Sequence, residues 1–390
     1  MNKMNRKLLV ITNTLASFGG GEKWALEVGT HMRRTFEIKY LNPVSKNSIE
    51  RMSIRRIKST YGLNESQIVN VRCIGKKSKA FETEDFILMI PTAKGLIDLS
   101  NAIKNSDVVY ILSMNPVILS YAIFQASLYK KKLIVGIHIP LVEKILEDKK
   151  TNRIYKTGYK YLLRRVKYFH VINRTDRETI KKHFPKANIY LIPNFVDIPK
   201  EKPKINNKKF VVMFASRMQT YQKGIDLLEK IVDDVADKQK NIIFHIIGSG
   251  GDGEQIAKRL EKKHKDNVKY LGFISEKKLN EEYSNANLFI STSRFESFGL
   301  SVAEAQAHGL PVVAFNVKGL DDQLDKKKQE LVNPYDCQKF ANTILDYHNS
   351  WKKNQKDYTK EKAIIYDIAK SKYSKDRITK LLIDMILWKQ

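Results

Sequence analysis

The chain has 390 residues, of which 42% are hydrophobic and 29% are charged, so it can build two hydrophobic cores and lacks the composition of a disordered protein. Its formal net charge is +28, and residues 1–198 carry 35 Lys and Arg against 16 Asp and Glu. This excess predicts an anionic partner: nucleic acid, an anionic membrane surface or a phosphorylated substrate. Cys73 and Cys337 fit no metal-ligand spacing and indicate a reduced, cytoplasmic protein.

The first half of the chain alternates short apolar runs with helical patterns. Helices are predicted at 22–34 and 176–183, and strands at 7–12, 68–74, 107–112, 133–137 and 169–172. Residues 108–129 contain no charged side chain and are long enough to span a bilayer. Asn115 and Pro116 interrupt this run, because Asn suits a helix cap and Pro the first helical turn. A buried strand followed by an apolar helix is therefore predicted there.

The second half repeats this alternation after a polar segment at 200–209 that predicts a linker. Beyond it, the pattern predicts a helix at 224–237 and strands at 210–215, 242–247, 268–271, 288–291 and 312–315. We therefore expect an α/β chain with two Rossmann-like domains, residues 1–198 and 199–365, and a C-terminal helix at 366–390 that crosses back to the first domain. Parallel sheets bind ligands at the carboxyl ends of their strands, so the expected binding site is a cleft between the domains.

Two features of the first half follow predicted strands. A glycine run precedes Glu22 and a helix, where free backbone N–H groups favour an anion: Gly19, Gly20, Gly21. A tight turn remains the other reading of this run. His138 ends a strand and is expected to point into the cleft, where an imidazole can donate to a sugar hydroxyl or to phosphate. A hydrogen-bonded structural histidine is the alternative.

Two features of the second half carry more chemistry. Arg217 and Lys223 lie six residues apart in the loop after strand 210–215, and both can neutralise a diphosphate. Glu296 precedes a predicted helix that contains Glu304. Free N–H groups at the start of this helix favour an anion, so one carboxylate can meet a ligand hydroxyl at each end of a bound phosphate.

These segments resemble glycosyltransferase family 4, a group of retaining enzymes with the GT-B fold, most densely over residues 190–315. The resemblance is carried by the Pro-Asn-Phe-Val-Asp run at 193–197, the loop from Arg217 to Gly224, the glycine loop at 248–250 and the Glu-x7-Glu segment at 295–314. The glycine run before Glu22 and the strand-end His138 match as well. Phe195 replaces the usual glycine, and residues 318–322 lack the usual paired glycines.

The resemblance implies a retaining hexosyltransferase that moves a hexose-type sugar from a UDP- or GDP-sugar to a glycan acceptor. Residues 1–198 would bind the acceptor and residues 199–365 the donor. Arg217 and Lys223 would hold the diphosphate, Glu304 the ribose, and Glu296 and His138 are the candidate catalytic residues. No metal is expected, because protein cations balance the diphosphate. The other implied donor contacts are Gly19, Gly20, Gly21, Gly248, Ser249, Gly250, Phe273, Phe298, Gly299, Leu300 and Ser301.

Basic amphipathic segments at 51–58 and 153–167 suit an anionic membrane surface and a polyprenyl-diphosphate-linked acceptor. We therefore expect a protein that binds peripherally to the inner face of the cell membrane. Two other readings remain: a sugar-nucleotide epimerase or hydrolase on the same fold, and a basic nucleic-acid-binding protein. The second lacks any zinc-finger or RNP motif.

Overall fold

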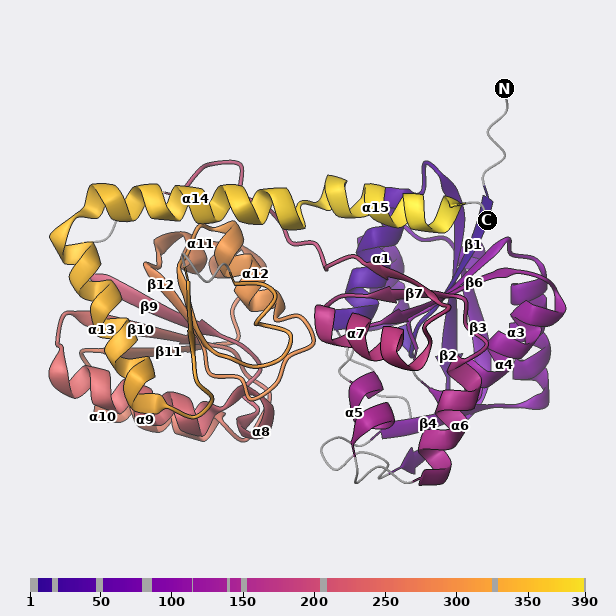
Figure 1. Cartoon of the computed structure of the whole chain (residues 1–390), viewed down its shortest axis with the longest axis horizontal. Coiled ribbons are helices and arrows are strands. Elements are labelled where there is room, and N and C mark those ends of the chain that lie inside the picture. Colours follow the sequence, from indigo (N-terminus) through magenta and orange to yellow (C-terminus); the bar gives the residue numbers. More distant parts are fainter. Residues whose placement is uncertain are drawn as a thin grey trace. The chain divides into compact units, whose positions relative to one another are not determined.

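The computed structural model describes residues 6–15, 20–46, 52–78, 86–113, 115–138, 141–148, 153–203, 209–324 and 329–388. The chain divides into two units, Met1–Ile192 together with Thr379–Gln390, and Pro193–Ile378. Each unit is an α/β sandwich with helices around one sheet (Figure 1). The predicted fold class, two Rossmann-like sheets, is therefore confirmed.

The first unit contains an eight-stranded sheet with the order β4-β3-β2-β1-β5-β6-β7-β8. Its strands are β1 (Arg6–Ile11), β2 (Phe36–Val44), β3 (Ile68–Ser78), β4 (Phe86–Pro91), β5 (Val108–Ile111), β6 (Lys132–Ile137), β7 (Tyr168–Val171) and β8 (Asn188–Leu191). All neighbours pair in parallel except β3 and β4, which are antiparallel. Its helices are α1 (Gly20–Met32), α2 (Ile54–Tyr61), α3 (Ala93–Lys104), α4 (Pro116–Leu128), α5 (Leu141–Glu147), α6 (Arg153–Leu163) and α7 (Arg174–His183).

The helices of the first unit are divided between the two faces of the sheet. From β1 the sheet is extended on one side by β2 and β3, and on the other side by β5, β6, β7 and β8 in turn. Because crossovers between parallel strands are right-handed, the helices of these two series lie on opposite faces of the sheet. The buried cluster on one face contains side chains from α3, α4, α5, α6 and α7, while α1 and α2 contact each other. The two basic segments, at α2 and α6, therefore lie on different faces.

The second unit contains a six-stranded parallel sheet with the order β11-β10-β9-β12-β13-β14. Its strands are β9 (Phe210–Ala215), β10 (Ile242–Ile247), β11 (Val268–Gly272), β12 (Leu288–Ser291), β13 (Val312–Phe315) and β14 (Glu330–Val332). Its helices are α8 (Thr220–Lys223), α9 (Ile225–Lys238), α10 (Glu254–Lys263), α11 (Glu276–Asn285), α12 (Leu300–Ala307), α13 (Cys337–Lys353) and α14 (Gln355–Tyr373). Strand β9 is buried at every position, which explains its uninterrupted apolar sequence.

The uncharged run at 108–129 forms β5 and α4. Asn115 caps α4, because its side chain accepts hydrogen bonds from the N–H groups of Val117 and Ile118, and Pro116 occupies the first turn. Within the described ranges, we find no helix with the length and apolarity needed to cross a bilayer.

The last helix, α15 (Lys375–Leu387), follows α14 after a break at Ser374, whose backbone is extended. From Thr379 onward it belongs to the first unit. The Lys132 ammonium of β6 donates to the carbonyls of Met385, Ile386 and Trp388 at 2.8 to 3.1 Å. A cation at the carboxyl end of a helix satisfies carbonyls that have no partner within it and also opposes the helix dipole. Lys132 thus fixes the end of the chain to the first sheet.

Helix α14 contains a buried lysine in the second unit. Lys362 is 1% exposed, and its ammonium donates to the Ala286 carbonyl at 2.9 Å. Gly309 allows this close packing, because a Cβ there would lie 2.5 Å from the Lys362 carbonyl oxygen. Burial lowers the pKa of Lys362 to about 8. Burial therefore disfavours the charged form, and folded Lys362 loses its proton at a lower pH than an exposed lysine does.

We predict that the free energy of unfolding rises with pH, because the burial of a charged Lys362 destabilises the folded state at lower pH. An unfolded lysine keeps its proton up to its ordinary pKa of about 10.4, whereas folded Lys362 loses it near pH 8. The free energy of unfolding should therefore gain about 3 kcal/mol between pH 8 and pH 10.5. Urea denaturation of Lys362→Met should show a rise that is smaller than that of the wild type by this amount, and Lys132, whose pKa burial also lowers to about 8, should account for a rise that remains.

The matched control is Lys360→Met on the same helix, where Lys360 forms an exposed pair with Asp357. This control should keep the rise seen in the wild type. A Lys362→Met protein with the same pH dependence as the wild type would contradict the prediction.

Candidate functional site

Three loops of the second unit meet at the carboxyl ends of β9, β10 and β12. The Met218 N–H, after β9, donates to the Ser249 carbonyl, after β10, at 3.2 Å. The Arg294 N–H, after β12, donates to the Gln222 carbonyl at 2.8 Å. The strand order reverses between β9 and β12, which is the usual position of a ligand site in a parallel sheet.

Lys223 and Glu296 form an ion pair in this region. The Nζ atom lies 2.5 Å from Oε1 of Glu296, and the two side chains are 13% and 9% exposed. The Ser293 hydroxyl donates to the same carboxylate oxygen at 2.8 Å, and the Thr292 hydroxyl donates to the Lys223 carbonyl at 2.8 Å. The structure thus brings together two residues that sequence analysis assigned to one ligand. Side by side, they offer a positive charge for an anionic group and an acceptor for hydroxyl groups.

Arg294 ties the loop after β12 to helix α9. Its guanidinium donates to both carboxylate oxygens of Asp226 at 2.9 and 2.7 Å, and to the Thr220 carbonyl at 2.8 Å. These hydrogen bonds lower the pKa of Asp226 below its ordinary value. Arg217 lies in the same loop as Lys223, is exposed, and donates to the Gln222 side-chain oxygen at 3.2 Å. Sequence analysis assigned a role to Arg217 and none to Arg294.

The glycine loop after β10 packs tightly against the loop after β9. Gly248 has φ +132°, and a Cβ there would lie 1.7 Å from the Ser216 carbonyl oxygen. Gly250 has φ +80°, with open space around the position of a Cβ. The Phe273 ring, just after β11, is 84% exposed. The glycine loop after β10 therefore presents its backbone, and the segment after β11 presents an uncovered aromatic ring.

Helix α12 begins at Leu300 after Gly299, which has φ +71°. The N–H groups of Leu300 and Ser301 belong to the first turn, where no intrahelical acceptor exists. The Phe298 ring is buried and packs edge-on against Tyr373 at 5.7 Å, and its carbonyl accepts a hydrogen bond from Gln323. Phe298 thus anchors the helix start, and its side chain faces the core.

Glu304, on α12, accepts a hydrogen bond from the Tyr283 hydroxyl at 3.0 Å. Tyr283 is 1% exposed, and burial raises the pKa of its hydroxyl well above the ordinary value. His308 stacks on the Tyr283 ring at 5.0 Å and donates from Nδ1 to the Glu304 carbonyl at 2.9 Å. The buried Tyr283 hydroxyl therefore holds the Glu304 carboxylate, a contact that the sequence pattern did not reveal.

In the first unit, polar side chains gather where the strand order reverses between β1 and β5. The Asn13 amide donates to Glu22 on α1 at 3.3 Å, and the Ser113 hydroxyl donates to the Asn13 side-chain oxygen at 2.8 Å. Glu22 is 7% exposed. Gly20 begins α1, Gly21 has open space around it, and Gly19 lies outside the described residues.

His138 follows β6 in the first unit and is partly exposed. Its ring packs on Trp24 of α1 at 4.4 Å, and its Nε2 lies 3.3 Å from Nδ1 of His170 on β7. Burial and the neighbouring His170 lower the pKa of His138 well below its ordinary value. His138 is therefore neutral at pH 7.

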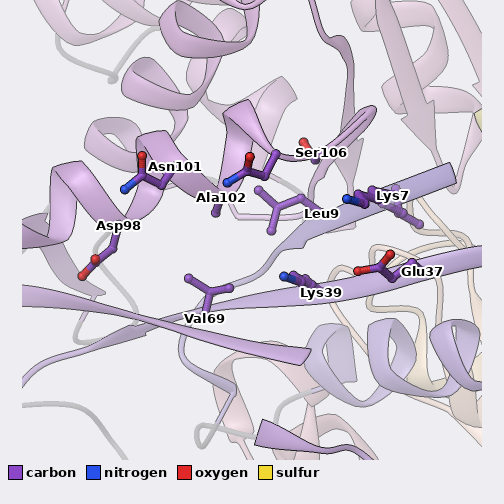
Figure 2. Close-up of a pocket in the computed structure, with 11 residues that line it drawn as sticks. Lys7, Leu9, Glu37, Lys39, Val69, Asp98, Asn101, Ala102 and Ser106 are labelled. Atoms are coloured by element: carbon purple, nitrogen blue, oxygen red, sulfur yellow. The ribbon is translucent and has the colours of Figure 1, made fainter. Parts of the chain in front are cut away.

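A cavity of about 240 Å³ lies at the opposite ends of the strands in the first sheet (Figure 2). It is lined by Lys7 and Leu9 of β1, Glu37 and Lys39 of β2, and Asp98 of α3, at the amino ends of β1 and β2. It contains none of the predicted site residues. In the part of the chain that the structure describes, no group of three or more His, Cys, Asp or Glu side chains is placed to hold a metal ion.

Comparison with known proteins places this geometry in context. Residues 195–364 match the family model described as "Glycosyl transferases group 1". Over 203 residues the chain is 32% identical to the poly(ribitol-phosphate) alpha-N-acetylglucosaminyltransferase of Staphylococcus aureus, covering 50% of this chain and 40% of that protein. The chain spans less than half the length of the curated relatives that it matches most strongly.

Solved structures match the whole chain. TarM superposes with a TM-score of 0.72 at 17% identity, covering 100% of both chains. Anabaena Alr3699/HepE in complex with UDP superposes with a TM-score of 0.72 at 16% identity, covering 96% of this chain and 98% of that one. The chain has the GT-B fold.

Within this GT-B chain, the side chains that sequence analysis missed support those that it found. The Ser293 hydroxyl holds the Glu296 carboxylate, and the Arg294 guanidinium holds the loop after β12. The Tyr283 hydroxyl holds the Glu304 carboxylate, and His170 contacts His138. Ser293 and Arg294 lie directly before the Glu-x7-Glu segment. His170 lies in a predicted apolar strand, where a lone polar ring is itself a signal.

We predict that Gly248 and Gly250 differ in their tolerance of alanine. Gly248→Ala should lower the free energy of unfolding by about 2–4 kcal/mol, because the backbone must move away from Ser216. The Cβ of Gly250→Ala would contact nothing, so this variant should lower the free energy of unfolding only by the backbone strain of about 1–2 kcal/mol. Urea denaturation of the two variants tests this, and an equal loss in both would refute the steric argument.

Proposed function

We propose that the chain is a retaining glycosyltransferase of family 4 that moves a hexose-type sugar from a nucleotide sugar to a glycan acceptor. The observation that carries the proposal is the ion pair of Lys223 and Glu296 at the reversal of strand order, within the segment that matches the group 1 glycosyl transferases. The UDP complex of HepE favours a UDP-linked donor.

In this proposal the second unit binds the donor. Arg217 and Lys223 neutralise the diphosphate, Glu296 accepts hydrogen bonds from sugar hydroxyls, and Glu304 accepts from the ribose. The free N–H groups of Leu300 and Ser301 add donors at the start of α12. The glycine loop at 248–250 and the exposed Phe273 surround the base. In the first unit, the glycine run at 19–21 and His138 are the candidate substrate contacts.

The departing diphosphate takes the proton of the acceptor hydroxyl on the face of the sugar that it leaves, so the anomeric configuration is retained. Positive charge that develops on the sugar is balanced by the diphosphate, and the charge of the diphosphate by Arg217 and Lys223. No separate nucleophile enters this scheme. We propose that the reaction needs no metal, because these two cations supply the compensating charge.

A panel of UDP- and GDP-sugars tests the donor site, with and without EDTA. We expect one donor to bind in the presence of EDTA and to be slowly hydrolysed without an acceptor. Glu296→Gln should lower this turnover by about 100-fold or more, since it weakens contacts that grow in the transition state. Glu229→Gln, which alters an exposed pair with Arg259, is the matched control and should stay within about two-fold of the wild type.

The products separate the proposed reaction from its alternatives. Free sugar or glycoside of the same anomeric configuration as the donor, observed by NMR, supports retaining transfer. An epimerised sugar would favour the epimerase alternative. If none of the donors binds, the assignment of Lys223 and Glu296 fails.

We further propose that the first unit binds an anionic membrane surface through α6 and the adjacent α4, where a lipid-linked, polyprenyl-diphosphate acceptor is held. Arg164 and Arg165 are exposed, Arg165 packs over the ring of Tyr161, and residues 149–175 contain no Asp or Glu. Exposed apolar side chains accompany the cations: Phe124 and Leu128 on α4, and Tyr161 on α6. Cations beside exposed apolar groups are typical of interfacial binding.

Sedimentation with vesicles that contain anionic lipid at low salt tests the membrane proposal. Replacement of four exposed cations by Gln should lower binding by about 100-fold or more, since each contributes on the order of 1 kcal/mol: Arg153, Lys160, Arg164 and Arg165. The control replaces four exposed cations of α10 and leaves the same net charge: Lys258, Arg259, Lys262 and Lys263. Equal binding by both variants would contradict a specific role for α6.

A further inference from the structure

Residues 317–324, which follow β13, cover one side of the backbone that leads into helix α12. A Cβ on Gly319 would lie 2.3 Å from the Glu296 carbonyl oxygen, so the two backbones are in direct contact. The Leu320 side chain lies close to Gly299 in the same way, because a Cβ on Gly299 would be 2.5 Å from its Cδ2 atom. This side of the backbone before α12 is therefore filled by protein and closed to a ligand.

Gln323, in the same segment, fixes the direction of one peptide group in that backbone. The Gln323 side chain is 3% exposed, and its Nε2 atom donates to the Phe298 carbonyl oxygen. A carbonyl oxygen can only accept a hydrogen bond, so it faces the nitrogen and not the oxygen of the amide group. The hydrogen bond therefore holds the Phe298 carbonyl toward the covered side.

The N–H of Gly299 belongs to the same peptide group. In a trans peptide the C=O and N–H bonds lie in one plane and point in opposite directions, and no peptide bond that the structure describes is cis. Since the Phe298 carbonyl points to Gln323, the Gly299 N–H points away from residues 317–324. Gln323 therefore determines, from behind, where this N–H group is directed.

The Gly299 N–H has no acceptor within the part of the chain that the structure describes, although the residue is buried. A buried N–H group without an acceptor is rare in folded proteins. The N–H groups of the next two residues, Leu300 and Ser301, begin α12 and have no intrahelical acceptor either. Successive free N–H groups at the start of a helix favour an anionic ligand.

Stability alone does not explain a glutamine at position 323. Its Oε1 atom is buried and has no hydrogen-bond partner among the described residues. A buried, unpaired amide oxygen costs free energy, which offsets the gain from the hydrogen bond to Phe298. An apolar side chain of the same length would avoid this cost, but it would leave the peptide group free to rotate. The direction that Gln323 gives to the Gly299 N–H is therefore what the glutamine adds.

We propose that Gln323 is a positioning residue, which directs the Gly299 N–H toward the diphosphate of the nucleotide-sugar donor. The direction of the peptide group rests on contacts within the second unit, and the diphosphate rests on the proposed glycosyl transfer. The family resemblance assigns no role to Gln323, which directly follows the segment 318–322 that lacks the usual paired glycines. The leaving diphosphate gains charge in the transition state, so an N–H that is already directed at it stabilises that state.

Crystal structures of the wild type with UDP or GDP test the geometry directly. We expect the Gly299 nitrogen within hydrogen-bond distance of a diphosphate oxygen, while the Phe298 carbonyl still accepts from Gln323. A diphosphate that binds without this N–H group would overturn the proposal.

Two variants separate positioning from packing. Gln323→Met keeps the length of the side chain and removes the donor to Phe298. Gln329→Met is the matched control, since Gln329 is another buried amide, 4% exposed, and accepts from Gln306 at 3.2 Å. Calorimetric titration with UDP and GDP should show that Gln323→Met weakens binding by about ten-fold or more, the effect of one misdirected hydrogen bond to a charged group. Gln329→Met should stay within about two-fold of the wild type.

Unfolding by urea provides a readout that a merely structural role would move in the opposite way. Gln323→Met should unfold close to the wild-type midpoint, because it removes the unpaired oxygen together with the hydrogen bond. Gln329→Met should unfold at a lower urea concentration, because Gln306 loses its nearer acceptor. An equal loss of nucleotide binding in both variants, or wild-type binding by Gln323→Met, would contradict the proposal.

If the wild type binds neither nucleotide and turns over no nucleotide sugar, the proposed function fails, and the diphosphate contact fails with it. The direction of the peptide group is decided separately, by a crystal structure of the protein without ligand. A Gly299 N–H that points toward residues 317–324 in that structure would refute the positioning role of Gln323.

Discussion

In both sheets the strand order reverses beside the first strand of the unit, and the loops on either side of the reversal leave toward opposite faces. The space between those loops can be filled only by side chains from the strand ends or by a ligand. In the second unit it contains Lys223, Ser293 and Glu296, and in the first unit Asn13 and Ser113. The candidate site is thus a consequence of topology, and the residue types there determine its chemistry.

The two units meet this constraint with different chemistry. The second unit places paired charges at its strand ends, and each pair is held by hydroxyls or a guanidinium, as with Ser293 beside Glu296 and Arg294 on Asp226. Such pairing offsets the desolvation free energy that a half-buried charge without a partner would cost. The first unit presents a neutral imidazole instead, although it carries the larger positive charge on its surface. Its cations include exposed residues of helices such as α6.

How far the sequence predicts this structure depends on burial. Strands 210–215, 242–247, 288–291 and 312–315 coincide with the observed bounds, because fully buried parallel strands are continuous apolar runs between polar loops. Strand β2 was not predicted from the sequence. Its nine residues include Glu37, Lys39 and Pro43, so they do not form a continuous apolar run. The antiparallel β4 likewise departs from the expected alternation of strand and helix.

The candidate site was predictable where residues lie close together in sequence. The segment from Ser293 to Glu304 contains both carboxylates and their helix start, and its neighbours Lys223 and Arg217 share one loop. Contacts between distant elements were not predictable, since no local pattern links Tyr283 to Glu304 or Tyr110 to His170. These partners become visible only when strands and helices far apart in sequence pack together.

The return of α15 to the first unit has a consequence for how the protein is made. A ribosome releases residues 1–192 long before residues 379–390, so the first unit emerges without the helix whose carbonyls Lys132 binds. The second unit, which is continuous in sequence, can complete its sheet as it emerges. The first unit is therefore completed only after the second unit, because it waits for residues 379–390.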